Sequence, residues 1–340
     1  MAPNSSWTEA WPRSETCRIV GPFPSMRQHE RTASRIVTRT VVFREQDRAA
    51  TFPDHPARSP GEPFVSEVEE AVHPSAHRQG EALAHDGRRI AWTEVGAGET
   101  ALLFLHGWCC DQSSWRHQMA AFADRFRCVS LDLAGHGRTS AIAPAETTLV
   151  AMASDVHLVR EALGLVNVFL VGHSMGGPVA VEAARHNPDG VLGIVGVDTL
   201  TDARMYARRP EEEIATRLEP LEADLPGSIA GLVRMITLVD RNGAGVVDEL
   251  TATMASVPPS VAIPSMRALL AWDIDERWPR AGVSVQAINS RALIPLIEEL
   301  PRRERLTVRT MADVGHFPML EDPDAFNAEL SALLGELPWP

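Results

Sequence analysis

The stretch Val171-Gly172-His173-Ser174-Met175-Gly176-Gly177 joins an apolar run to a segment with helical spacing, and it has a glycine two residues on either side of a serine. The run 168–171 predicts a buried strand, and the segment 175–187 predicts a helix. A sharp turn between them lifts the Ser174 hydroxyl above the sheet, and the two glycines permit the crowded backbone. The helix start also points free N–H groups at negative charge that develops nearby. Ser174 is therefore the candidate nucleophile.

The sequence on both sides of this turn alternates between short apolar runs and longer amphipathic stretches. Such alternation is typical of a buried parallel sheet covered by helices. The expected strands are 101–105, 128–131, 168–171, 191–197, 283–288 and 306–311, and the expected helices are 113–124, 148–164, 175–187 and 322–335. We predict an α/β fold in which a mostly parallel, doubly wound sheet is flanked by helices.

Residues 201 to about 275 interrupt this alternation. The segment is mostly helical in pattern. It carries prolines at positions 210, 220, 226, 258, 259 and 264. An insertion of this size inside an otherwise regular α/β sequence predicts a helical lid.

The first 78 residues differ in composition from the rest. They are rich in Arg, Ser, Pro and Glu and show no sustained period of a helix or a strand. Too little apolar surface is present to offset the entropy of ordering the chain. We expect a disordered extension, or upstream sequence translated from a wrongly chosen start codon, followed by one domain over 79–340. Within the extension, only 36–43 has the pattern of an isolated strand.

The composition excludes several classes of function. The net charge of -13 argues against a nucleic-acid partner, because a phosphate-binding surface needs clustered cations. All 32 basic residues are arginine. Without lysine, the chain cannot form a Schiff base, anchor pyridoxal phosphate or build a P-loop.

The cysteines and the hydropathy indicate a soluble, cytoplasmic protein. The four cysteines lack both the spacing of a metal site and the density of a secreted disulfide scaffold. No apolar run approaches the roughly 18 residues that span a bilayer. Glu9 and Glu15 stand where a signal peptide would be apolar.

The block Val314-Gly315-His316-Phe317-Pro318-Met319-Leu320-Glu321 follows the last expected strand and precedes the last expected helix. His316 therefore lies on a loop at the same sheet edge as Ser174. The chain order, with serine first and histidine last, is the order that this architecture uses for a catalytic triad. We expect His316 to be the base that activates Ser174.

A second loop can supply hydrogen-bond donors to an oxyanion. The run ending Leu105-His106-Gly107-Trp108 closes another expected strand. The backbone N–H of Trp108 and that of Met175, the residue after the nucleophile, are the candidate donors. Removing one such donor typically costs a few kcal/mol of transition-state stabilisation.

These motifs, together with Asp132-Leu133-Ala134-Gly135-His136-Gly137-Arg138-Thr139, resemble the α/β-hydrolase family over residues from about 80 to 340. The resemblance is to single-domain bacterial members with a helical lid. That group includes carboxylesterases, lactonases and cofactor-free haloperoxidases. It implies a serine hydrolase with no cofactor and no metal.

The position of the triad acid departs from the family pattern. Members often carry it after the strand that here is 283–288, but the residues that follow, Asn289-Ser290-Arg291-Ala292, include no carboxylate. The known alternative is the end of the preceding strand, where Asp198 stands. Because parallel strands deliver their carboxyl ends to one edge, Asp198 can meet His316. Its other possible role is to cap the following segment.

The other acids are weaker candidates. Asp273 and Asp275 precede a strand and should lie at the opposite edge, and Asp313 would need an awkward return to reach His316. Glu298 and Glu299 fall on an expected helix. A metal cluster of His106, His136, His173 and His316 is a further alternative, against which stands the lack of a supporting carboxylate at short spacing.

The function that follows is hydrolysis of a carboxylic ester or a related small acyl substrate through an acyl-enzyme. Two alternatives stay open: perhydrolysis, in which hydrogen peroxide replaces water, and a hydrolase-like protein that binds a ligand without turning it over. The sequence does not choose the acyl chain, the alcohol or the oligomeric state. Cys109 and Cys110, beside the oxyanion loop, are expected to be small buried residues rather than nucleophiles.

Overall fold

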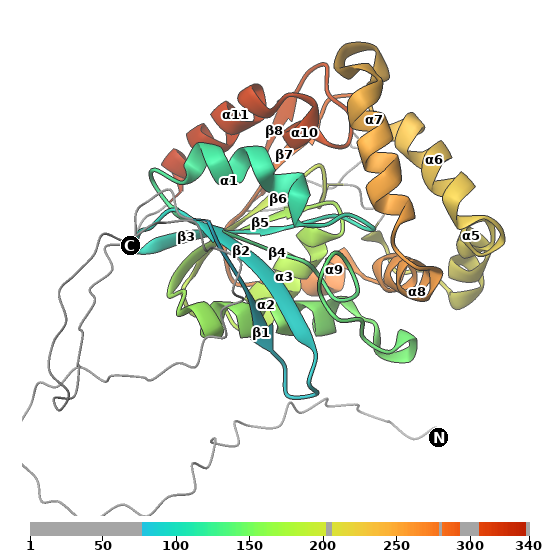
Figure 1. Ribbon diagram of the computed structural model, residues 1–340, viewed down its shortest axis with the longest axis horizontal. Coiled ribbons are helices and arrows are strands. Elements are labelled where there is room, and N and C mark those ends of the chain that lie inside the picture. The colour runs from blue at the N-terminus through green and yellow to red at the C-terminus, as the bar shows by residue number, and fades with distance from the viewer. Residues whose placement is uncertain (1–76, 202–205, 279–280, 293–305, 338–340) are drawn as a thin grey trace, which may run out of the picture. The chain divides into compact units, whose positions relative to one another are not determined.

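The computed structural model describes residues 77–201, 206–278, 281–292 and 306–337, apart from the side chains of 239–244 (Figure 1). One eight-stranded sheet runs in the order β1-β2-β4-β3-β5-β6-β7-β8. Its strands are β1 (Arg78–Leu83), β2 (Arg89–Val95), β3 (Thr100–Leu105), β4 (Arg127–Leu131), β5 (Asn167–His173), β6 (Val191–Val197), β7 (Val285–Ser290) and β8 (Leu306–Met311). Strands β3 to β8 pair in parallel. This confirms the mostly parallel α/β fold and the six strands expected from the sequence.

The sequence did not reveal the first two strands, which form an antiparallel hairpin at one edge of the sheet. Four of the six residues of β1 are exposed, so this strand has no apolar run. In β2, the buried Glu94 interrupts the apolar pattern. Its carboxylate is paired with Arg127 on β4 and with Arg78 on β1, which accounts for a charge at a buried position.

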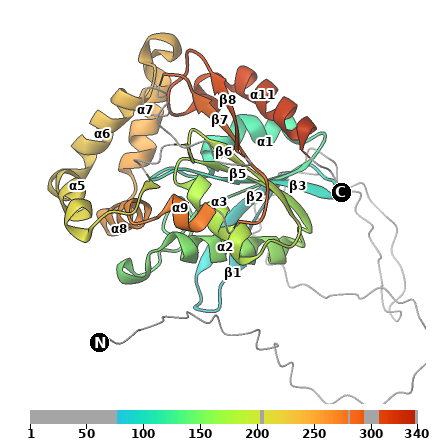
Figure 2. The ribbon, with the colours of Figure 1, turned by 180° about the vertical axis from the view of Figure 1, so that it is seen from behind.

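Helices cover both faces of the sheet, as predicted (Figures 1 and 2). One face carries η1 (Gln112–Trp115), α1 (Arg116–Phe122), α10 (Pro318–Glu321) and α11 (Pro323–Glu336), and the other carries α2 (Leu149–Leu163), α3 (Gly176–His186) and α9 (Ile274–Arg277). On the first face the buried ring of Trp115 lies between Phe104 of β3 and Phe326 of α11, with ring centroids 5.0 and 6.4 Å away. These aromatic contacts join the layers.

Local sequence signals set the ends of these helices. The Thr148 hydroxyl accepts a hydrogen bond from the Ala151 N–H at the start of α2, and Gly164 ends that helix in the left-handed conformation. Asp322 caps α11 in the same way through the Ala325 N–H, with Pro323 in the first turn. Capping residues in the sequence therefore set where α2 begins and ends and where α11 begins.

The segment between β6 and β7 is helical, in agreement with the sequence pattern of 201–275. It holds α5 (Glu211–Ala223), α6 (Leu225–Ile236), α7 (Val239–Ala255) and α8 (Pro259–Leu270), followed by α9. We call α5 to α8 the helical insertion. Their role as a lid stays a prediction.

The expected extension over 1–78 and its isolated strand 36–43 lie outside the described residues except for the last two positions. Strand β1 begins at Arg78, next to the expected start of the domain. Among the helices of the described ranges, none combines the length and the apolar content that crossing a membrane requires.

The turn between β5 and α3 is a crowded backbone connection at the carboxyl edge of the sheet. Ser174 has a φ of 49°, a left-handed conformation that few non-glycine residues adopt. A Cβ on Gly172 would lie 2.2 Å from the Gly176 carbonyl oxygen, and one on Gly176 would lie 2.4 Å from the Leu105 carbonyl oxygen. Only glycine lets the start of α3 pack this closely on β5 and β3.

Gly172→Ala should therefore destabilise the fold, because the added methyl meets backbone atoms that cannot rotate away. The expected cost is about 3 kcal/mol. For a domain of this size that lowers the melting temperature by about 6–12 °C, measured by circular dichroism or calorimetry.

Gly231→Ala in α6 is the matched control. A Cβ there meets nothing within 4 Å, and in a helix the exchange should raise the stability by about 0.5–1 kcal/mol. Equal melting temperatures for the two variants would contradict the packing described for the turn.

Candidate active site

Three strand ends bring the sequence-predicted catalytic residues to one edge of the sheet. Ser174 follows β5, Asp198 follows β6, and His316 follows β8 after a short loop. Asp198 has a φ of 46°, so it shares the left-handed conformation of Ser174. Such conformations in non-glycine residues cost about 1–3 kcal/mol and cluster at functional sites.

Asp198 and His316 are joined by a short hydrogen bond. The His316 Nδ1 lies 2.5 Å from the Asp198 Oδ2, and the Asp198 side chain is 5% exposed. The other carboxylate oxygen, Oδ1, accepts a hydrogen bond of 2.8 Å from the Ser290 N–H at the end of β7. A carboxylate can only accept, so Nδ1 carries the proton and Nε2 is left with a lone pair.

The backbone of His316 is fixed on both sides. Its N–H donates to the Ile236 carbonyl, 2.7 Å away at the end of α6, and its carbonyl accepts from the His173 Nε2 at 2.8 Å. Burial lowers the pKa of His173 well below its ordinary value, so the ring is neutral and Nε2 carries the donated proton. His173, next to Ser174 in the chain, thus orients the histidine loop.

The buried carboxylate of Glu321, for which the sequence indicated no role, binds the backbone of the loop that carries His316. Glu321 accepts hydrogen bonds from the N–H groups of Gly315 (2.9 Å) and Phe317 (3.0 Å), the two neighbours of His316. It also accepts one of 3.1 Å from the Leu238 N–H in the helical insertion. The sequence signal that could have indicated this role is the position of Glu321 in the same block as His316.

The candidate oxyanion loop passes directly beside Ser174. A Cβ on Gly107 would lie 3.2 Å from the Ser174 Cβ and 2.7 Å from the His173 Nδ1, so glycine allows this approach. Trp108 follows, with its indole Nε1 donating to the Ala262 carbonyl on α8 at 2.8 Å. Met175 begins the turn into α3 and is fully buried. Both candidate donors are therefore chain neighbours of residues that meet at the turn: Met175 follows Ser174, and Trp108 follows Gly107.

Asn289, where the family often has its acid, serves a buried polar network. Its Oδ1 accepts from the Thr199 N–H at 3.3 Å, and its Nδ2 donates to the Thr201 Oγ1 at 2.6 Å. The Thr199 hydroxyl in turn donates to the Ser174 carbonyl at 2.8 Å. The two residues that follow β6 thus contact different segments: Asp198 binds His316, and Thr199 binds the backbone of Ser174.

The competing acids are engaged elsewhere or lie outside the described residues. Asp273 caps α9 by accepting the N–H groups of Asp275 and Glu276. Asp313 stands in a left-handed turn after β8, with a φ of 62°. Glu298 and Glu299 lie in the range that the structure leaves undescribed.

The remaining histidines of the expected cluster act within loops. The His106 Nδ1 donates to the Gly107 carbonyl, and its Nε2 accepts the Leu133 N–H, which occupies both ring nitrogens. Burial lowers the pKa of His106 to about 4 and that of His136 to about 3, so both are neutral near pH 7. Across the described ranges, no three histidine, cysteine or acidic side chains converge as metal ligands would.

The cysteines beside the oxyanion loop are buried thiols. Burial raises the pKa of Cys109, and it raises the pKa of Cys110 to about 12. The thiolate is the reactive form, so at neutral pH neither group is a nucleophile. Cys128 on β4 is equally buried, with its pKa raised to about 12.

Comparison with known proteins identifies the family to which this chain belongs. The model of the alpha/beta hydrolase family matches residues 102–329. This chain belongs to the alpha/beta hydrolase family. The hydrolase predicted from the sequence is supported at that level.

Individual relatives of this hydrolase differ in their names. It is 30% identical over 273 residues to the dihydrolipoyllysine-residue acetyltransferase component of an acetoin cleaving system from Cupriavidus necator, covering 74% of this chain and 67% of that one. It is 29% identical to the putative carbamate hydrolase RutD of Caulobacter vibrioides, covering 70% and 91%. The structure of a thermophilic esterase from Thermogutta terrifontis shares the fold, with a TM-score of 0.64 and 24% identity, over 76% of this chain and 98% of that one.

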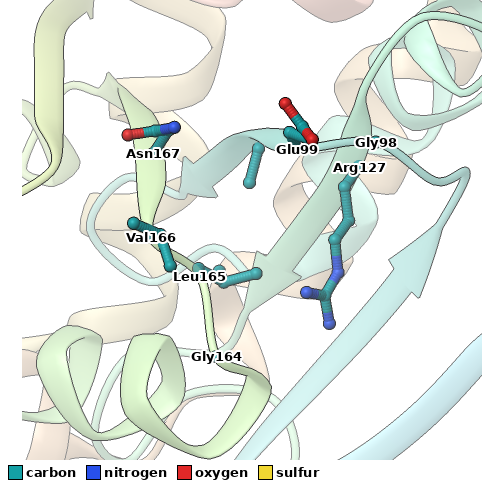
Figure 3. A pocket seen from close by; sticks show the side chains of 8 residues that line it. Gly98, Glu99, Arg127, Gly164, Leu165, Val166 and Asn167 are labelled. Atoms are coloured by element: carbon teal, nitrogen blue, oxygen red, sulfur yellow. The ribbon is translucent and has the colours of Figure 1, made fainter. Parts of the chain in front are cut away.

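Two hollows lie at opposite edges of the hydrolase sheet. One of about 320 Å³ is lined by residues that include Glu99, Arg127 and Asn167, at the amino ends of β3, β4 and β5 (Figure 3). It is on the wrong edge to serve Ser174. A smaller one of about 100 Å³, where Cys110 and Asp111 meet Thr253 and Ser256, lies at the junction between the oxyanion loop and the helical insertion.

Asp198→Asn should lower the turnover of this hydrolase on the order of 10⁴-fold, the scale seen when the histidine tautomer is wrong. The Ser290 N–H selects the amide oxygen, which turns the amide NH₂ toward His316. Nδ1 must then accept, and the proton moves to Nε2, where the base is needed. Steady-state kinetics on an activated ester, with circular dichroism to verify folding, measure the effect.

Asp273→Asn is the control for this prediction. Asparagine caps a helix about as well as aspartate, so the start of α9 should survive the exchange. We expect its turnover to stay within about twofold of the wild-type value. An active Asp198→Asn variant would remove Asp198 from the catalytic machinery.

Proposed function

We propose that this protein is a serine hydrolase that cleaves carboxylic esters or related acyl compounds through a Ser174-His316-Asp198 triad. One observation carries the proposal: Asp198 holds Nδ1 of His316 at 2.5 Å, beside a serine held in a left-handed turn. A histidine fixed in that tautomer has the lone pair of Nε2 available for a serine hydroxyl.

The chemistry divides into two acyl transfers. His316 Nε2 removes the proton of Ser174 while the serine oxygen bonds to the substrate carbonyl carbon, and the carbonyl electron pair moves onto oxygen. The N–H groups of Trp108 and Met175 stabilise this oxyanion. Its collapse breaks the bond to the leaving alcohol, which takes the proton from His316. Water then repeats the sequence and releases the acid.

The buried carboxylate of Asp198 supports both steps. When His316 takes up the proton, the imidazolium forms against a negative charge that is 5% exposed and therefore weakly screened by water. The attraction favours the charged state that arises during the reaction.

The proposed substrates share one reactive group, a carbonyl with a leaving oxygen or sulfur. Esters, lactones and thioesters present it. A carbamate, the compound class in the name of the Caulobacter relative, has a carbonyl carbon of the same kind. The alternative of perhydrolysis uses the same acyl-enzyme, with hydrogen peroxide replacing water in the second step.

A panel of p-nitrophenyl esters of graded chain length, lactones and carbamates, plus bromination in the presence of acetate and peroxide, separates these classes.

Ser174→Ala and His316→Ala should each lower turnover by about 10⁴-fold or more, and the double variant should be no worse, because residues of one catalytic unit fail together. Both single variants should have a melting temperature near that of the wild-type protein. Ester turnover by Ser174→Ala at a tenth of the wild-type rate would rule out the serine mechanism.

A fluorophosphonate probe tests the same proposal without a substrate. Only an activated serine reacts, so wild-type protein should be labelled, and Ser174→Ala should not. Absence of labelling in folded wild-type protein would instead favour the ligand-binding alternative.

A further inference from the structure

The helical insertion is bonded directly to the loop that carries His316. The contact is made by Ile236, Thr237 and Leu238, at the junction between α6 and α7. The Ile236 carbonyl accepts the His316 N–H at 2.7 Å, and the Leu238 N–H donates to Glu321 at 3.1 Å. Gly315 allows this approach, because a Cβ there would lie 2.3 Å from the Ile236 carbonyl oxygen.

Glu321 is the centre of this contact. Its Oε2 accepts the N–H groups of Gly315 and Leu238, and its Oε1 accepts that of Phe317. The residue is 7% exposed, so these bonds form where water cannot replace them. Three N–H groups that converge on one buried carboxylate make charge-assisted hydrogen bonds, which are stronger than neutral ones.

We infer that Glu321 is a positioning residue that ties His316 to the helical insertion and thereby sets the reactivity of Ser174. It never touches the reacting atoms. It fixes the backbone on both sides of His316, while Ile236 fixes the backbone of His316 itself. The imidazole then keeps its position against Asp198 only while the α6–α7 junction stays bonded to the histidine loop. This inference rests on the proposed function, since it assumes that His316 is the base.

A purely structural role for Glu321 predicts something different. If the carboxylate only stabilised the start of α10 and α11, its loss would lower the melting temperature and leave the folded enzyme as active as before. A positioning role predicts a loss of kcat with little change in KM, because the geometry of proton transfer changes while the substrate surfaces stay.

Glu321→Gln is the first test. Glutamine keeps the volume and one acceptor oxygen, but its NH₂ group must face at least one of the three N–H donors. We expect kcat for a p-nitrophenyl ester to fall about 10- to 100-fold, the scale of a catalytic group displaced by about 1 Å. KM should stay within about threefold. The rate of fluorophosphonate labelling should fall in parallel with kcat.

Leu238→Pro tests the same link from the insertion side. Leu238 has φ -81° and Thr237 has φ -108° and ψ 137°, which suit a proline and the residue before one. The change deletes the N–H that Glu321 accepts. Leu238→Ala, which loses the side chain and keeps the N–H, is the matched control.

We expect Leu238→Pro to have a kcat on the order of tenfold below that of Leu238→Ala, about the scale of one charge-assisted hydrogen bond. Glu321→Gln combined with Leu238→Pro should be no slower than Glu321→Gln alone, since both changes break one link.

Equal kcat values for Leu238→Pro and Leu238→Ala would overturn the inference, and so would a folded Glu321→Gln variant with wild-type kcat. If Glu321→Gln does not fold, the Leu238 pair decides alone. The proposed function has a separate test: an active Ser174→Ala variant would contradict it, regardless of the result for Glu321→Gln.

Discussion

The backbone hydrogen bonds that continue beyond the ends of the parallel strands determine where the candidate catalytic residues Ser174 and Asp198 lie. The Ser174 N–H donates to the Val197 carbonyl at 3.1 Å, and the Asp198 N–H donates to the Ile288 carbonyl at 2.9 Å. The first bond extends the pairing of β5 with β6 by one hydrogen bond, and the second extends the pairing of β6 with β7 in the same way. Because parallel strands all emerge at one edge, residues far apart in the chain become neighbours there. The left-handed turns at Ser174 and Asp198 then direct the side chains out of the sheet.

The helical insertion is attached to this edge at two places. The Trp108 indole binds the Ala262 carbonyl on α8, beside the candidate oxyanion donors. On the histidine side, the α6–α7 junction binds His316 and Glu321. These hydrogen bonds place the insertion directly against both candidate catalytic loops.

Much of this arrangement was readable from the sequence, for physical reasons. A strand covered on both faces must be apolar along its length, and this made β3 to β6 visible. Strands β7 and β8 were expected from shorter apolar runs, although three of the six residues of β8 are exposed at the edge of the sheet. The hairpin of β1 and β2 was missed because β1 is mostly exposed and the charge of Glu94 is neutralised by distant arginines. The position of Asp198 followed from the shared edge of parallel strands. The groups that hold it and His316 could not be predicted: the Ser290 N–H and the Ile236 carbonyl are backbone atoms, which leave no trace in residue identity. Glu321 depends on Leu238, a contact 83 positions away.

The most direct test of the central claim is to find the acyl group on the chain. Wild-type protein is mixed with p-nitrophenyl acetate, quenched with acid within the first turnovers and digested, and the peptides are mapped by mass spectrometry. The account predicts one acetyl group on the peptide containing Ser174, located at Ser174 by fragmentation. Turnover with the acetyl group on the peptide of Cys109 and Cys110, or with no acylated peptide at any time, would contradict it.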